Sequence, residues 1–288
     1  MIGVADPDSE KGELLAQEHQ CRYVSDYRDF IGEIDAAVVA TPTVLHAPIG
    51  CELLEAGVDV LIEKPIAPSL EEARQLNQAA QKNKRIIQVG HLERFNPAVE
   101  LLSQLKATPL FFEIHRLSLF TPRSLDVDVV LDLMIHDLDI VLSLTGMMPE
   151  EIRAAGIRIL SSKVDIANVR LQFPGGCIAN LTASRASTEQ VRKLRLFAPH
   201  QYFSLDYSRQ ELVSVKVNKD RQIGFENIPV EKDEPLKKEV GEFVDCVRSR
   251  RQPRVTGESA TKALEVALEI LVKIEQHAQV VASSLGSR

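Results

Sequence analysis

The sequence lacks the glycine-rich GxGxxG pattern, with which many dinucleotide-binding domains hold phosphate groups, in all of its 288 residues. It also lacks any apolar run that approaches the roughly 20 residues of a membrane-spanning helix. The first residues reach Asp6 before any long apolar stretch, so they do not form a secretory signal pattern. These absences argue against a membrane protein and remove the usual sequence marker of phosphate binding.

Positive charge is also scarce. The chain has 34 Lys and Arg against 41 Asp and Glu, a net charge of -7. This balance argues against general nucleic-acid binding, although a local basic pocket is compatible with it. Four widely spaced cysteines form no metal-binding pattern and fit reduced thiols: Cys21, Cys51, Cys177 and Cys246. We therefore expect a cytoplasmic protein with no metal site, no nucleic-acid partner and no membrane contact.

The first hundred residues alternate between apolar strand patterns and helical patterns. Strands are expected over 1–5, 36–40, 58–62 and 86–90, and helices over 9–19, 47–56 and 69–84. Near-continuous apolar strands separated by helices indicate a parallel sheet that is covered on both faces. Residues 1–97 are therefore predicted to form a dinucleotide-binding domain of the Rossmann type.

The pattern changes in the second part of the chain. Helices are expected over 97–105 and 129–144, a strand over 110–115, several strands between 151 and 225, and closing helices over 236–248 and 259–281. Strands joined by short turns indicate a largely antiparallel sheet. The predicted fold class is thus α/β, with an α+β domain over 98–288 that contains an open, mostly antiparallel sheet.

The expected dinucleotide domain starts unusually. Asp6, before Pro7, has the place of the acidic residue that ends the second strand of such domains and binds the adenosine ribose. No first strand, glycine loop or first helix precedes it. Either a piece of about 30 residues, the size of a βαβ unit, is lacking, or the chain works without it; we expect the former. The alternative for Asp6 is an ordinary turn residue before proline.

Two motifs carry candidate chemistry. The tripeptide Glu63-Lys64-Pro65 ends an apolar strand, at the sheet edge where ligands of parallel sheets bind. Asp132 and His136 lie four residues apart on one face of an expected helix, where a carboxylate can orient an imidazole and raise its pKa for acid/base work. The alternatives are a solvated strand end for the tripeptide and a surface or capping pair for Asp132 and His136. Taken together, the two motifs form a candidate proton-transfer centre.

These motifs, in their order, resemble the Gfo/Idh/MocA family of oxidoreductases. The resemblance rests on residues 40–43 (Ala-Thr-Pro-Thr) with His46, on the tripeptide 63–65, and on Asp132-x-x-x-His136. It implies a Rossmann domain followed by an α/β domain that serves substrate binding and oligomerisation, NAD or NADP as cofactor, and redox chemistry at a sugar or polyol carbon. The catalytic residues that it implies are Lys64, Asp132 and His136. The expected cofactor-binding residues are Asp6, Thr41, Pro42, His46, Glu63 and Lys64.

A narrower resemblance points to the branch of this family that oxidises the 3-hydroxyl of a UDP-N-acetyl amino sugar. It rests on residues 89–97, 183–185 and 192–195. The expected substrate-binding residues are Arg94, Asn96 and Arg185, since arginine binds a diphosphate through two parallel hydrogen bonds. On a strand, Lys193 and Arg195 share one face and Arg192 takes the other. The alternative is that these three cations make surface or subunit contacts.

We therefore expect an NAD(P)-dependent sugar dehydrogenase acting on a sugar or nucleotide sugar. His136, oriented by Asp132, would take the hydroxyl proton, and Lys64 would bind the same oxygen. The rival is a non-catalytic sugar- or nucleotide-binding regulatory homologue, against which the retention of all three residues argues. The open sheet face should pack against a partner, and the resemblance implies a homodimer or homotetramer.

Overall fold

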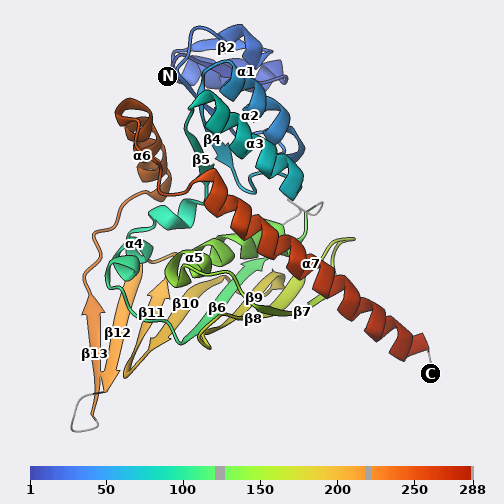
Figure 1. Ribbon diagram of the computed structural model, residues 1–288, viewed down its shortest axis with the longest axis vertical. Helices are drawn as coiled ribbons and strands as arrows, with labels where there is room; N and C mark the ends of the chain where they lie inside the picture. The colour runs from blue at the N-terminus through green and yellow to red at the C-terminus, as the bar shows by residue number, and fades with distance from the viewer. Residues whose placement is uncertain (121–126, 218–221, 287–288) are drawn as a thin grey trace.

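The computed structural model describes residues 1–120, 127–217 and 222–286, which form an upper and a lower half joined by the last helices (Figure 1). In the N-terminal half, short parallel strands alternate with helices. Its strands are β1 (Gly3–Ala5), β2 (Arg22–Val24), β3 (Ala36–Val39), β4 (Asp59–Glu63) and β5 (Ile87–Gly90). Its helices are α1 (Ser9–Glu18), η1 (Tyr27–Phe30), η2 (Thr43–Leu45), α2 (His46–Glu55), α3 (Leu70–Asn83) and η3 (Leu92–Phe95).

The parallel strands form two separate sheets, β1–β2 and β3–β4–β5. In β4, four consecutive residues are buried, as expected for a strand covered on both faces. In β3, by contrast, Val38 is 53% exposed. The break between the sheets falls where the first strand of a Rossmann fold would lie, between its second and fourth strands. The predicted Rossmann-type sheet without its first strand and helix is confirmed.

The C-terminal half contains one large sheet in the order β13-β12-β11-β10-β6-β9-β8-β7. Its strands are β6 (Phe111–Leu119), β7 (Glu151–Ile157), β8 (Ile166–Gln172), β9 (Ile178–Ser187), β10 (Val191–Ala198), β11 (Gln201–Asp206), β12 (Glu211–Val217) and β13 (Ile223–Ile228). Within it only β6 and β9 pair in parallel, so the prediction of a mostly antiparallel sheet is confirmed. Alternating burial along β8 and β10 indicates one packed face and one wetter face.

Helices of the C-terminal half lie along one face of this sheet (Figure 1). They are α4 (Pro97–Gln104), the π-helical turn η4 (Val130–Met134), α5 (Ile135–Thr145) and the 30-residue α7 (Gly257–Gly286). Their apolar side chains share a core with the packed sheet face. None of the helices in the described ranges could cross a membrane by its length and apolar content.

Two late segments of the chain pack back onto the parallel strands. Helix α6 (Pro235–Ser249) brings Phe243 and Cys246 against Leu61 of β4. Val255, in the segment before α7, and Leu264, in the first turns of α7, add to the core of the N-terminal half together with neighbouring residues. The expected division at residue 97 remains a prediction about domains, because the last helices contribute to both cores.

The elements differ from the sequence prediction at two places. Strand β2 was not expected, because three residues are too few to produce a periodic pattern. The helix expected over 129–144 starts with the π-helical turn that holds Asp132 and becomes α-helical at Ile135. Such turns are frequent at functional sites. Helix α3 starts as predicted, because the hydroxyl of Ser69 accepts from the backbone N–H of Glu72 and donates to its carboxylate.

Candidate active site

Polar side chains from both halves meet at the carboxyl ends of β4 and β5. Three residues that follow these strand ends lie on one side: Lys64, His91 and Arg94. Three residues along η4 and α5 lie opposite, at spacings of four and three that place them on one side of a helix: Asp132, His136 and Asp139. They face each other in order, as Lys64 with Asp132, His91 with His136 and Arg94 with Asp139.

Lys64 is fixed by two hydrogen bonds to one residue. Its Nζ donates to the backbone oxygen of Asp132 at 2.6 Å and to Oδ1 of the same residue at 3.1 Å. The Lys64 side chain is 21% exposed. An ammonium group has three protons to donate, so one remains for an oxygen atom that enters the site.

His136 lies next to this lysine, and its buried Nδ1 has no hydrogen-bond partner among the described residues. Burial and the positive charges of Lys64 and Arg116 hold the pKa of His136 well below its usual range. The expectation that Asp132 raises this pKa is wrong, because the Asp132 carboxylate pairs with Lys64 instead. At neutral pH the imidazole is therefore neutral and can accept a proton.

Arg94 reaches the same site from the turn η3. Its Nη1 lies 3.5 Å from Oδ2 of Asp139, whose side chain is 3% exposed. The backbone oxygen of Arg94 accepts a hydrogen bond of 2.9 Å from Nη1 of Arg254, which fixes η3 to the segment before α7. Arg94 was predicted to bind substrate, and the structure places it among the facing pairs.

A buried arginine, Arg116, connects the elements that carry the site residues. Arg116 on β6 donates through Nε and Nη2 to both carboxylate oxygens of Asp137, each at 2.8 Å, and through Nη1 to Glu93 at 2.9 Å. Its guanidinium lies 4.9 Å from the ring centre of Tyr207. This cluster joins β6, η3 and α5, the elements that carry Arg94 and His136.

The predicted cofactor residues near Lys64 line the same sheet edge. The hydroxyl of Thr41 is buried and has no partner among the described residues. His46 is buried, with Nε2 at 2.9 Å from the Thr41 oxygen and Nδ1 at 2.9 Å from the Pro65 oxygen. The carboxylate of Glu63 lies so close to Gly90 that a Cβ there would be 2.9 Å from Oε2. His46 thus holds two loops of this edge together.

Asp6 follows β1, and Pro42 follows β3 of the other parallel sheet. Oδ1 of Asp6 accepts from the backbone N–H of Asp8 at 2.8 Å, the bond of an Asx turn, and its backbone oxygen accepts from Tyr23. The backbone oxygen of Pro42 accepts from Leu45 at 2.8 Å and starts η2. Both roles are local, and cofactor binding by these residues remains a prediction.

Asn96 and Arg185, both predicted to contact substrate, are buried and bonded within the protein. Asn96 caps α4 through Oδ1 and donates through Nδ2 to the backbone oxygen of Tyr207 at 3.0 Å. Arg185 donates to the backbone oxygen of Val127, just before η4, and its Nε lies 3.8 Å from Asp165. These contacts position the elements of the site, and direct substrate contact by either residue remains a prediction.

Glu239 on α6 carries a buried carboxyl group. Burial and the negative charge of Glu63 raise its pKa from the ordinary 4.5 to about 8. The folded protein therefore keeps a proton that the unfolded chain releases, so the free energy of unfolding should fall as pH rises from 4.5 to about 8.

Glu239→Gln should remove this pH dependence of the unfolding free energy and raise Tm at alkaline pH only. Thermal unfolding of both proteins between pH 4.5 and about 8 checks this prediction. Parallel curves of Tm against pH for the native protein and the variant would contradict it.

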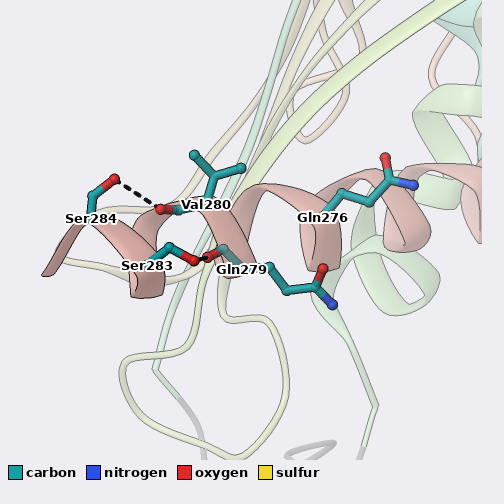
Figure 2. A pocket seen from close by; sticks show the side chains of 5 residues that line it. All are labelled: Gln276, Gln279, Val280, Ser283 and Ser284. Carbon is teal, nitrogen blue, oxygen red and sulfur yellow. Dashed lines mark hydrogen bonds between the residues drawn. The ribbon is translucent and has the colours of Figure 1, made fainter. Parts of the chain in front are cut away.

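Two hollows of the surface lie away from these pairs. One of about 240 Å³ lies on β7 and β8 and is lined by Glu151, Arg153, Arg170 and Gln172. The other follows the last turns of α7, where the hydroxyls of Ser283 and Ser284 donate to backbone oxygens of Gln279 and Val280 (Figure 2). Neither hollow is lined by a residue of the facing pairs.

Sequence reasoning missed two members of the facing pairs. His91 follows β5 as Lys64 follows β4, and its position within the motif 89–97 was the available signal. Asp139 lies seven residues after Asp132, so helical spacing could have placed it on the same side. Conversely, Arg192 lies opposite Arg116 in the sheet and so on the helix-covered face, whereas Lys193 and Arg195 lie on the other face, as predicted.

Comparison with known proteins gives this geometry a context. Residues 1–91 match the oxidoreductase family with an NAD-binding Rossmann fold, and residues 114–200 match the GFO/IDH/MocA C-terminal domain. UDP-N-acetylglucosamine 3-dehydrogenase of Acidithiobacillus ferrooxidans is 34% identical over 285 residues, 97% of this chain and 91% of that protein. The NAD+-dependent scyllo-inositol 2-dehydrogenase of Bacillus subtilis is 26% identical over 93% of this chain and 84% of its own.

Solved structures agree with the sequence matches. A crystal form of the Acidithiobacillus ferrooxidans enzyme superposes with a TM-score of 0.92 at 34% identity, over 96% of this chain and 90% of that one. The aldose-aldose oxidoreductase of Caulobacter crescentus, at 21% identity and a TM-score of 0.82, shares the fold. These findings favour the enzyme over a non-catalytic binding homologue, and the chain belongs to the Gfo/Idh/MocA family of NAD-binding oxidoreductases.

Proposed function

We propose that this chain oxidises the 3-hydroxyl of UDP-N-acetylglucosamine with NAD as the hydride acceptor. The observation that carries the proposal is the pairing of a fixed lysine ammonium with a neutral, half-buried histidine at the strand edge: Lys64 and His136. The similarity to the dehydrogenase of Acidithiobacillus ferrooxidans, over 97% of this chain, supports the choice of substrate.

The residues at the strand edge fit the nicotinamide end of NAD. The carboxyl edge of a parallel sheet is where such folds bind dinucleotides, and the orphaned hydroxyl of Thr41 lies there. Thr41, Pro42, Glu63 and Lys64 would line the nicotinamide end, with His46 supporting their loops, and Asp6 would bind the adenosine ribose. When bound, NAD supplies the acceptor for the hydride that leaves the sugar carbon.

The protein's own residues would handle the proton. His136, neutral at physiological pH, takes the proton of the sugar hydroxyl as the carbon is oxidised. Lys64 donates its remaining proton as a hydrogen bond to the same oxygen and stabilises the negative charge that develops there. Asp132 holds the ammonium in place through its carboxylate and its backbone oxygen.

A half-buried arginine supports an anionic substrate. Arg192 acts electrostatically on His136, and its side chain has no ion pair or hydrogen bond to any part of the chain that the structure describes. An unpaired guanidinium beside a candidate base suits the diphosphate of a nucleotide sugar. We assign diphosphate binding to Arg192 together with Arg94.

Replacing Arg192 should therefore weaken substrate binding rather than the chemical step. Arg192→Gln is expected to raise KM for UDP-N-acetylglucosamine about 10–100-fold, the loss of a charged hydrogen bond, with little change in kcat. Arg195→Gln is the matched control, because Arg195 lies on the other face and pairs with Glu113 at 2.9 Å. Steady-state kinetics check this, and equal KM effects in both variants would contradict it.

We also propose that the protein is a homodimer or homotetramer that packs through the open sheet face. That face carries half-buried aromatic rings in contact, with Phe197 5.8 Å from Phe111 and 5.1 Å from Tyr202. Light scattering at micromolar concentration should give a mass of at least two chains, and Phe197→Lys should shift it toward one. A monomeric native protein would contradict the proposal.

We place the protein in the cytoplasm, where its four free cysteines stay reduced.

A substrate panel tests the proposed function. The chain, saturated with NAD, should form reduced nicotinamide with UDP-N-acetylglucosamine and far more slowly with N-acetylglucosamine, which lacks the diphosphate. Equal rates with both sugars would contradict the nucleotide-sugar assignment. No reduction with either, despite NAD binding, would contradict dehydrogenase activity on this substrate class.

A further inference from the structure

His91 is a buried histidine between the two halves of the site, and the proposed reaction does not use it. It follows β5 directly. Because Gly90 of β5 is paired with Glu63 of β4, His91 takes the position after β5 that Lys64 takes after β4. It is 1% exposed, and burial lowers its pKa, so the ring is neutral. The charges that act on it are Lys64, Arg94 and Asp139, all members of the facing pairs.

Three nitrogen atoms of the two facing imidazoles have no hydrogen-bond partner among the described residues. They are Nδ1 and Nε2 of His91 and Nδ1 of His136, and each is closed to solvent. An unmet buried polar group of this kind destabilises the folded protein. Because these atoms are closed to solvent, a partner for them has to lie inside the protein.

The arrangement of the rings suits one enclosed water molecule. The ring centres are 6.1 Å apart and the ring planes are nearly perpendicular, at 88°. At this separation of the ring centres a direct nitrogen-to-nitrogen hydrogen bond is out of reach, whereas nitrogens about 4.5–5.5 Å apart, which the separation allows, can share one water. Buried waters typically satisfy polar atoms that the protein leaves unpaired.

We propose that His91 is a positioning residue that orients the base His136 through a water molecule held between the two rings. The water accepts a hydrogen bond from the Nδ1–H group of His136 and donates one to a nitrogen of His91. The second nitrogen of His91 then carries its proton, a tautomer that the nearby carboxylate of Asp139 favours. Among the described residues, the buried Oδ2 of Asp139 accepts no hydrogen bond and lies 3.5 Å from Nη1 of Arg94.

This chain of contacts fixes which nitrogen of His136 is basic. With the proton held on Nδ1, the lone pair is on Nε2, the atom left for the sugar hydroxyl. Asp132 does not supply this orientation, because within the described residues its carboxylate bonds to Lys64 and not to His136. The inference rests on the proposed role of His136 as the base.

The tautomer can be measured on the protein without substrate or cofactor. In ¹⁵N-labelled protein, two-bond nitrogen–proton NMR correlations distinguish the two neutral forms of each imidazole. We expect His136 to be a single Nδ1–H tautomer, its signals being assigned by their loss in His136→Gln. The Nε2–H form, or a mixture of both forms, in the native protein would overturn the proposal.

Two substitutions separate orientation from packing. His91→Phe keeps the ring and removes the hydrogen bond, so His136 should become a mixture of tautomers and kcat should fall about 10–100-fold, as for other supporting hydrogen-bond partners, with KM nearly unchanged. His91→Gln keeps an acceptor for the water and should largely restore the single tautomer and the rate. If His91 only packs, His91→Phe would leave the tautomer unchanged, which would contradict the proposal.

Different results would overturn the base assignment of His136 and the water bridge to His91. A single Nδ1–H tautomer that depends on His91, in a protein whose His136→Ala variant keeps its rate, would overturn the proposed base and leave the water bridge in place. A full loss of rate in His136→Ala, with a tautomer that does not respond to His91, would overturn the bridge alone. The tautomer measurement uses the native chain, so it decides even if His91→Phe does not fold.

Discussion

His136→Ala should lower kcat by about 10²–10⁴-fold, the usual contribution of a general acid/base group, with little change in KM for the sugar. The reason is that Lys64 and the arginines of the site remain in place to bind substrate, while the group that takes the hydroxyl proton is gone. Steady-state kinetics with saturating NAD measure both parameters.

The control for this variant is an exposed histidine far along the same chain. His277 lies on the exposed side of α7, and His277→Ala should leave kcat unchanged. Because burial and neighbouring cations lower the pKa of His136 from its usual 6.5, the acidic limb of the kcat/KM profile should lie below pH 6.5 in the native enzyme. A near-normal rate in His136→Ala would contradict the assignment of the base.

Arg116→Met should lower the free energy of unfolding by about 3–5 kcal/mol, as expected when one partner of a buried ion pair is removed. The variant would leave the carboxylate of Asp137 buried without its two hydrogen bonds and would also release Glu93. Urea unfolding measures the change.

Two further variants show whether the loss comes from the stranded charge. The double variant Arg116→Met/Asp137→Leu should recover much of the stability, because no unpaired carboxylate remains. Arg195→Met removes an exposed ion pair with Glu113 and should change the unfolding free energy by less than about 1 kcal/mol. A small effect of Arg116→Met, similar to that of Arg195→Met, would contradict the supporting role of the buried cluster.

The sequence allowed much of the fold to be predicted because its periodicity is local. The apolar run of β4 and the helix start at Ser69 are properties of adjacent residues, and both appear in the structure. The resemblance of three short motifs was sufficient to identify the family, since Lys64 and His136 lie within them.

What could not be predicted depends on residues far apart in the chain. Asp132 and His136 were expected to interact because of their spacing, but Lys64, 68 residues before Asp132, takes the carboxylate. The same holds for Arg116 and Asp137, which no local pattern connects. Contacts between the strand ends and α5 exist only once both halves of the protein are folded.

The most direct test of the proposed reaction follows the hydride itself. UDP-N-acetylglucosamine with deuterium at carbon 3 of the sugar is mixed with NAD and the native protein, and the nicotinamide is analysed by mass spectrometry and NMR. The account predicts that deuterium appears at C4 of the nicotinamide and that His136→Ala slows its transfer. Reduced nicotinamide without deuterium, or no transfer by a protein that binds both ligands, would contradict it.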